Sequence, residues 1–222
     1  MKNSILILVL LMSVGNASAD DGTFRAQARL FFGTTKVNPT DANSLMSSQS
    51  LNSFDNLAQV GVEINYPVLR FLDVGMRFAH KFNARYEQNG NMSVNNSGQI
   101  TQEALLLLAR IPLFRSSVFK FDLFGGVGGS NTNFAIKTTS LDGKYSKNFT
   151  DDFLASPYFA AGASVGVGYK SFYLYVEGGY DRNRVIHLKP SGTVPSTDAT
   201  LDLTGPYVMV GLLFDGITVT QK

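Results

Sequence analysis

The sequence predicts an all-β protein, an eight-stranded antiparallel up-and-down transmembrane β-barrel with short periplasmic turns and long extracellular loops. Three observations support this fold class. Apolar and polar residues alternate with a period of two over segments of about ten residues. Short and long connections alternate between these segments, and aromatic residues stand at both ends of the apolar faces. The longest purely apolar run after the N-terminus covers only residues 104–109, whereas a spanning helix needs roughly 20 residues.

The first residues have the pattern of a secretory signal peptide. Lys2 gives a positive start, residues 5–12 are apolar, and Ala17 and Ala19 are the small residues that a signal peptidase requires. We therefore expect a cleaved signal peptide over residues 1–19, a transmembrane barrel over 20–214 and a short C-terminal extension over 215–222. An uncleaved membrane anchor is the alternative interpretation of the first segment.

The composition restricts the partners and the means of stabilisation. Nineteen Lys and Arg stand against 17 Asp and Glu, so the chain is nearly neutral. This balance gives no reason to expect nucleic acid as a partner, because that would need a clustered basic face. Cys is absent, which excludes disulfides and a cysteine-anchored lipoprotein. Packing or the membrane itself must stabilise the fold.

Eight segments are predicted as strands. They are centred on residues 24–32, 60–66, 72–82, 100–111, 119–123, 159–169, 172–180 and 208–214. The segment 100–111 is the weakest, because Leu105 and Leu107 share a side with Glu103 and its leucines would also suit a short helix. Tight connections are expected around 67–70, 112–116 and 170–171, and long polar ones around 34–56, 84–99, 130–156 and 183–204. Pro67 and Pro112 stand in these tight connections, where we expect no backbone N–H to be needed for hydrogen bonds between strands.

Outward-facing aromatic residues are predicted to form two girdles. The periplasmic girdle would contain Phe24, Tyr66, Phe119, Tyr169, Phe172 and Phe214, and the outer one Phe32, Phe78 or Phe82, Phe159 and Tyr180. Alternation alone would also fit a soluble sandwich or a lipocalin-like barrel. The loop asymmetry and the girdles favour a lipid-facing wall and therefore the bacterial outer membrane.

The predicted barrel, residues 20–214, resembles the small outer-membrane barrels of the OmpA/OmpX-like and OmpW-like families. Its last strand, residues 205–214, begins with Gly205, alternates apolar residues and closes on Phe214, as the assembly signal of these families does. Residues 215–222 depart from the many members that end at the aromatic residue. The resemblance implies three partners: outer-membrane lipid, lipopolysaccharide, and the insertion machinery, which would read the last strand. We expect a monomer.

The inward face of the predicted barrel is charged. Its expected basic residues are Arg25, Arg29, Arg77, Lys81 and Lys120, and its expected acidic residues are Glu63, Asp73, Glu103, Asp122, Glu177 and Asp181. An eight-stranded barrel is only wide enough for side chains or one small ligand. A plugged interior is the simplest interpretation, and a narrow or gated pore is the alternative. The inward glycines would make room for large side chains, or else line a cavity for a hydrophobic ligand.

No catalytic, cofactor-binding or metal site is predicted, although two motifs resemble one. Ser164 lies in a G-x-S-x-G match followed by Asp181 and His187, but the strand continues through it without the required elbow. The stretch around His80 resembles that of outer-membrane lipid A deacylases, yet Phe82 stands where that family has its serine. We interpret His80 as an interfacial residue.

The long loops are the remaining candidates for function. Residues 133–139 and 145–149 are expected to extend strands above the membrane as a protruding sheet, which would bind a surface partner by strand addition or remain a solvated surface. Turn signals stand at Asn89-Gly90 and Asp142-Gly143. We expect a non-enzymatic barrel serving envelope integrity or surface interaction. A small pore or carrier for hydrophobic solutes is the alternative, and a lipid A-modifying hydrolase is a remote one.

Overall fold

A computed structural model describes residues 23–48, 51–83, 86–89, 94–140, 143–151, 156–192 and 199–220. Eight long strands form its wall: β1 (Thr23–Lys36), β2 (Asn56–Leu69), β3 (Leu72–Phe82), β5 (Val94–Arg115), β6 (Phe119–Ser140), β8 (Ser156–Tyr169), β9 (Phe172–Gly192) and β11 (Gly205–Thr220). The long connections contain α2 (Thr40–Ser47), β4 (Tyr86–Asn89), β7 (Gly143–Thr150) and β10 (Ala199–Asp202). The expected signal peptide, residues 1–19, lies outside the described residues. No helix in the described ranges is long and apolar enough to cross a membrane.

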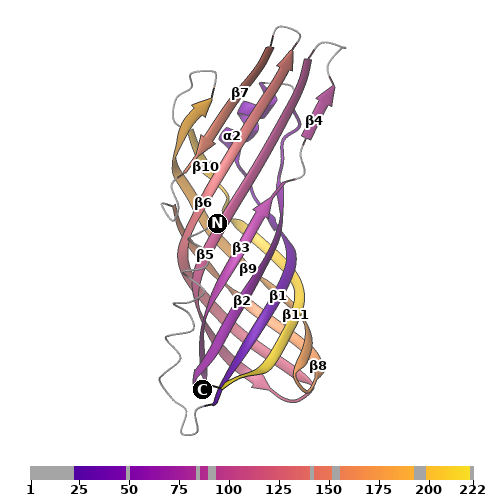
Figure 1. Ribbon diagram of the computed structural model, residues 1–222, viewed down its shortest axis with the longest axis vertical. Helices are drawn as coiled ribbons and strands as arrows, with labels where there is room; N and C mark the ends of the chain where they lie inside the picture. The colour runs from indigo at the N-terminus through magenta and orange to yellow at the C-terminus, as the bar shows by residue number, and fades with distance from the viewer. Residues whose placement is uncertain are drawn as a thin grey trace.

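The eight long strands close into an antiparallel barrel (Figure 1). Each consecutive pair is hydrogen-bonded, and β1 pairs with both β2 and β11, which closes the ring. Closure leaves no open edge within the wall, as hydrocarbon demands, because an unpaired backbone group there costs several kcal/mol. The predicted fold class is confirmed.

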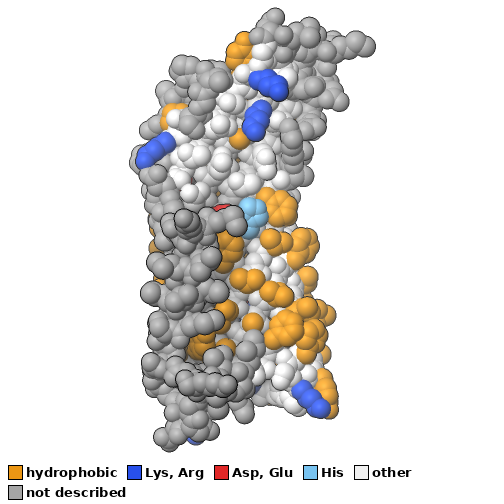
Figure 2. All heavy atoms as spheres, in the orientation of Figure 1, with side chains coloured by type: hydrophobic (Ala, Val, Ile, Leu, Met, Phe, Trp, Pro, Cys, Tyr) orange, Lys and Arg blue, Asp and Glu red, His pale blue; other side chains and the backbone are white. Residues whose placement is uncertain are grey.

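The two faces of the wall differ in the way that a membrane requires. Along β3, Asp73, Arg77 and Lys81 are buried inside, while Val74 and Phe78 are exposed outside. Exposed apolar side chains occur on all eight wall strands and form an apolar belt. Figure 2 shows the part of this belt on the lower half of the visible face. Exposed aromatic residues lie at both ends of the wall strands: Phe119, Tyr169 and Phe172 at one end, and Phe32, Phe78, Phe159 and Tyr180 at the other. The belt and its girdles match a lipid-facing surface.

The strand β5 corrects the prediction for segment 100–111. Glu103, expected inside, is exposed on the outer face, and Arg110 lies inside instead. The phase of β5 follows from its pairing with β3, which sets Arg110 opposite the inward Asp73. Because successive side chains alternate between faces, Glu103 must then point outward. The four leucines belong to a strand and not to a helix.

The connection between β5 and β6 also differs from the prediction. The strand β5 runs through Pro112 to Arg115, and the turn is confined to residues 116–118. The register shifts between Pro112 and Phe114. Proline has no N–H for the ladder, so an irregularity of the pairing at that point accommodates it within the strand.

The strands β5 and β6 extend far beyond the membrane. Each has 22 residues, about twice the 9–11 that a tilted strand needs to cross the hydrocarbon. Above the belt, β7 pairs with β6 on one side and with β9 on the other. The protruding sheet expected for residues 133–139 and 145–149 is therefore confirmed. Of the expected turn signals, Gly90 and Asp142 lie outside the described residues.

The C-terminal segment continues the last strand. β11 runs to Thr220, and its pairing with β1 shifts register between Ala26 and Gln27. The sequence analysis assigned residues 215–222 to a C-terminal extension. Residues 215–220 are part of β11 and thus belong to the wall. The carboxylate of Asp215 forms an ion pair with the inward Lys120.

Candidate functional site

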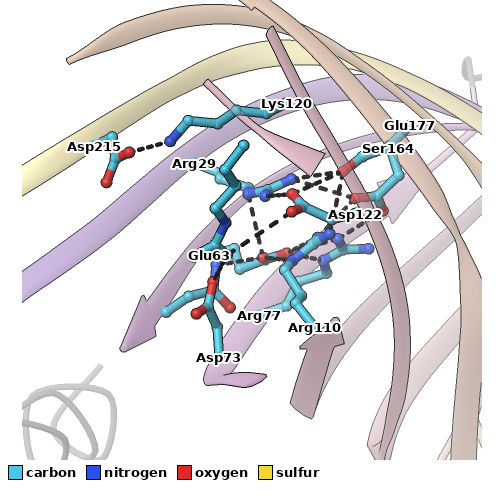
Figure 3. Close-up of polar contacts among 12 residues, drawn as sticks. Arg29, Glu63, Asp73, Arg77, Arg110, Lys120, Asp122, Ser164, Glu177 and Asp215 are labelled. Atoms are coloured by element: carbon cyan, nitrogen blue, oxygen red, sulfur yellow. Dashed lines mark hydrogen bonds and ion pairs between the residues drawn. The ribbon is translucent and has the colours of Figure 1, made fainter. Parts of the chain in front are cut away.

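The barrel interior at the level of the membrane holds a network of buried charges (Figure 3), with charged residues from β1, β2, β3, β5, β6 and β9. The strand register places Glu63 of β2 between Arg29 of β1 and Arg77 of β3. Because directly opposed residues share a face of the sheet, all three side chains point inward. On the other side of the barrel, Glu177 of β9 lies opposite the inward Ser164 of β8.

Glu63 is held by two arginines. Its carboxylate accepts two hydrogen bonds from the Arg110 guanidinium, from Nε at 2.5 Å and from Nη2 at 2.9 Å. Nε of Arg77 donates a third bond to Oε2 at 2.8 Å. Such forked, charge-assisted contacts are among the stronger polar interactions in proteins. Asn65 adds a bond from its amide to Oε1 at 2.6 Å.

The same two arginines reach across the lumen to Glu177. Nη2 of Arg77 donates to Oε1 at 2.6 Å, and Nη2 of Arg110 donates to Oε2 at 2.7 Å. The Tyr207 hydroxyl lies 3.1 Å from Oε1. Two arginines and two glutamates therefore form a closed ring of contacts that ties β2, β3 and β5 to β9 through the middle of the barrel.

Arg29 joins this ring to β6 and β8. Its Nη2 donates to Oδ2 of Asp122 at 2.6 Å, and its Nη1 donates to the Ser164 hydroxyl at 3.1 Å. Ser164, singled out by the G-x-S-x-G match, is thus surrounded by the ion network. Asp181 of the same match forms an ion pair with Lys81 at 2.6 Å. The side chain of His187 lies outside the described residues.

Further ion pairs lie above and below this ring. Lys81 with Asp181 is on the extracellular side, while Arg115 with Asp73 and Lys120 with Asp215 are on the periplasmic side. The charged side chains of the ring and of these ion pairs are no more than 5 % exposed, except for Arg115 at 29 % and Asp215 at 32 %. Buried charges are tolerated when they are paired and hydrogen-bonded, and each of these charged groups has at least one ion-pair partner.

Aromatic rings fill the space between the charged groups. The guanidinium carbon of Arg110 lies 4.6 Å from the centre of the Phe124 ring, and that of Arg29 lies 5.1 Å from the centre of the Tyr175 ring. The inward glycines make room for such rings. A Cβ at Gly61 would lie 2.3 Å from Cζ of Phe31. Side chains thus occupy the space at this glycine, as the first of the two interpretations predicted.

The extracellular half of the interior has an apolar core. It consists of Val37, Ala42, Met46, Leu51, Phe54, Leu57, Ile100, Phe134, Ile136, Phe149, Leu188, Leu201 and Leu203. The helix α2 contributes Ala42 and Met46, which are at most 2 % exposed, so the helix packs onto this core. The rings of Phe134 and Phe149 stack with their centroids 5.9 Å apart. This core was not predicted, because most of its members stand in segments assigned to loops.

Sequence reasoning also missed Arg110, the residue that joins Glu63 to Glu177. Its position along the strand was the available signal, since Gln102 and Arg110 are the polar residues at even-numbered positions in the segment 100–111. The charge of Glu103, however, predicts that the odd-numbered residues of this segment face inward. Glu103 instead lies on the outer face opposite His80, and the half-buried His80 ring stacks on Phe82 at 5.6 Å.

Comparisons with known proteins extend to structure but not to sequence. No protein-family model and no curated protein matches the chain. The outer-membrane protein OprG of Pseudomonas aeruginosa is similar over 90 % of this chain and 97 % of its own, with 14 % identity and a TM-score of 0.50. Ail, the attachment invasion locus protein of Yersinia pestis, is similar over 88 % of this chain and 99 % of its own, with 12 % identity and a TM-score of 0.44.

These likenesses concern the fold. The similarity to OprG extends over nearly the whole of both chains, and the closed eight-strand wall and the exposed apolar belt agree with it. A barrel with a polar interior and an apolar exterior is stable in lipid. The chain therefore has the fold of the small β-barrels of the bacterial outer membrane, with an exterior suited to lipid.

Proposed function

We propose that the protein is a non-enzymatic barrel with a closed interior, which serves envelope integrity or surface interaction. The observation that supports this most directly is the presence of two different barriers in series along the lumen. The ring of Glu63, Arg77, Arg110 and Glu177 crosses the barrel at the level of the membrane. The apolar core packed with α2 fills the extracellular half.

The two barriers oppose different solutes. Ions and polar solutes would have to displace paired charges from one another, and an isolated charge left in such an interior is costly. They would also meet an apolar core that offers no hydrogen bonds. A hydrophobic solute that entered the extracellular core would meet the charged ring below it. The arrangement therefore favours closure over conduction.

Planar-bilayer recording of the refolded chain, residues 20–222, tests the closed interior. We expect no reproducible single-channel steps, because the ring of paired charges and the apolar core both oppose the passage of water and ions. Insertion would be verified by the different gel mobilities of boiled and unboiled samples. Steady, reproducible steps would contradict the proposal and support the alternative of a small pore.

Replacement of His80 by Ala tests the absence of lipid A chemistry. We expect the lipid A mass spectrum of cells expressing this variant to match that of cells expressing the wild type. The reason is that Phe82, stacked on His80, stands where the resembling enzymes have their nucleophilic serine. A vector-only strain provides the baseline. If the wild type alone altered lipid A, the protein would be a lipid-modifying enzyme.

The protruding sheet is the region best placed for surface interaction. The hairpin of β6 and β7 stands above the apolar belt (Figure 1). Residues 147–150 of β7 already pair with β9, so this part of β7 is not available for strand addition. Lys137 and Lys144 are exposed on this hairpin.

A further inference from the structure

A cavity opens between the first extracellular connection and β10. Its volume is about 390 Å³, within the usual range for small-molecule sites. It is lined by Asn38, Thr40, Asp41, Tyr180, Thr200, Leu201, Asp202 and Thr204. Of these lining residues, Leu201 also belongs to the apolar core, and the others lie outside that core and outside the ion network.

The alternation of the chain places the cavity on the outside of the wall. In the segment that follows the start of β10, Leu201 and Leu203 are buried in the extracellular core, so Thr200 and Asp202 face the other way and are exposed. Tyr180 is 54 % exposed and belongs to the outer aromatic girdle. The cavity therefore lies where the hydrocarbon ends and the saccharide headgroups of the outer leaflet begin.

The lining groups are chiefly hydrogen-bond acceptors and hydroxyls. Oδ2 of Asp41 accepts a hydrogen bond from the Thr200 hydroxyl at 2.5 Å, and Oδ1 of Asp202 accepts one from the Thr204 backbone N–H at 2.9 Å. An ionised carboxylate has two oxygens and about four acceptor positions. Both aspartates therefore keep acceptor capacity for donors in the cavity, while existing bonds hold them in position.

We propose that this cavity binds a neutral, hydroxyl-rich saccharide, supplied by an outer-leaflet glycolipid. Sugar hydroxyls donate to the two carboxylates, and the apolar C–H face of the sugar ring packs on the exposed Tyr180 ring. Two neighbouring carboxylates repel phosphate, since like charges placed together are costly. The site therefore selects an unphosphorylated sugar. This inference requires the membrane placement of the barrel but is independent of whether the interior conducts.

Calorimetric titration of the full mature chain in detergent tests the proposal. The probes are intact rough-type lipopolysaccharide and its released core oligosaccharide, each before and after enzymatic dephosphorylation with reduction of the sugar carboxyl groups to alcohols, which makes the oligosaccharide neutral. Asp202→Asn is expected to weaken binding of the dephosphorylated oligosaccharide by about tenfold, because its hydrogen bonds to the sugar lose their charged acceptor. Tyr180→Leu is expected to weaken binding by a similar factor, because the sugar ring loses the aromatic face on which it packs. Glu103→Ala is the matched control, because it removes an exposed carboxylate elsewhere on the outer wall, and it should bind as the wild type does.

The comparison of probes distinguishes a membrane glycolipid from a soluble saccharide, and an unphosphorylated sugar from a phosphate. Tighter binding of the intact glycolipid than of the free oligosaccharide supports the membrane source, and equal binding would replace it with a soluble saccharide. Binding that disappears on dephosphorylation or on addition of EDTA would overturn the proposal in favour of a cation-bridged phosphate. Unchanged binding in both variants would also overturn it. Boiled and unboiled gel mobility shows for each variant that the barrel is folded.

Discussion

Replacement of Arg110 by Ala is expected to lower the free energy of unfolding by about 3–5 kcal/mol, the range found when one partner of a buried ion pair is removed. Arg110 donates to both Glu63 and Glu177. Without it, Arg77 is the remaining arginine that hydrogen-bonds to both carboxylates, while Arg29 keeps only the longer contacts of 3.7 Å to Glu63 and 4.0 Å to Glu177. The midpoint of urea unfolding in lipid vesicles, followed by the loss of the fast-migrating unboiled gel band, measures the effect.

Two variants serve as controls for this result. Lys137→Ala removes an exposed charge on β6 and should change stability by no more than about 0.5 kcal/mol, as surface substitutions usually do. The double variant Glu63→Gln/Arg110→Met removes one charge of each sign and should recover part of the loss, because no carboxylate is left without its main partner. An Arg110→Ala protein with the wild-type midpoint would show that the ring does not hold the barrel together.

Opening of the lumen is expected only when both barriers are weakened together. The first change is the neutral double truncation Glu63→Ala/Arg110→Ala, which removes one cation and one anion from the ring. The second replaces residues 40–47 by a Gly/Ser linker of equal length, which removes Ala42 and Met46 from the extracellular core. Because the barriers lie in series, each change alone should leave the barrel silent in planar bilayers, and the combination should give single-channel steps.

The outcome of this experiment distinguishes the two barriers. Steps after the ring truncation alone would show that the extracellular core does not seal the lumen. Single-channel steps after the linker replacement alone would show that the ring does not seal the lumen. A silent combined variant with intact heat-dependent mobility would indicate that residual side chains still fill the lumen, and it would contradict the assignment of closure to these two elements.

The fold class could be predicted because each strand of a membrane barrel separates lipid from a polar interior. Lipid outside and polar groups inside impose a period of two on every strand, and the girdles and connections record where each strand meets the interface. Arg29, Arg77 and Lys81 were placed inside on this basis, and they are buried there. The same reasoning is wrong for β5, where leucines occupy both faces. There the charge of Glu103 predicts that the odd-numbered residues face inward, whereas the even-numbered ones do.

The partners within the barrel could not be read from the sequence. The contact between Arg77 and Glu177 joins residues that are 100 positions apart, and it depends on the stagger of strands around the whole ring. The stagger is a property of closure and not of any one segment. The apolar core above the ring was missed for a related reason, since Leu188 and Met46 become neighbours in one core only when separate connections fold over the same opening.

Alternation and residue type along the chain were sufficient to predict a barrel, the inward side chains of most strands, and an interior with both signs of charge. The pairing of these charges, the link from Glu63 to Glu177 through Arg110, and the packing of α2 onto the core above them are visible only in the folded barrel. The physical reason is that alternation is a local property, imposed on each strand by the two solvents it separates. Pairing across a lumen is a global property, which exists only once the last strand has met the first.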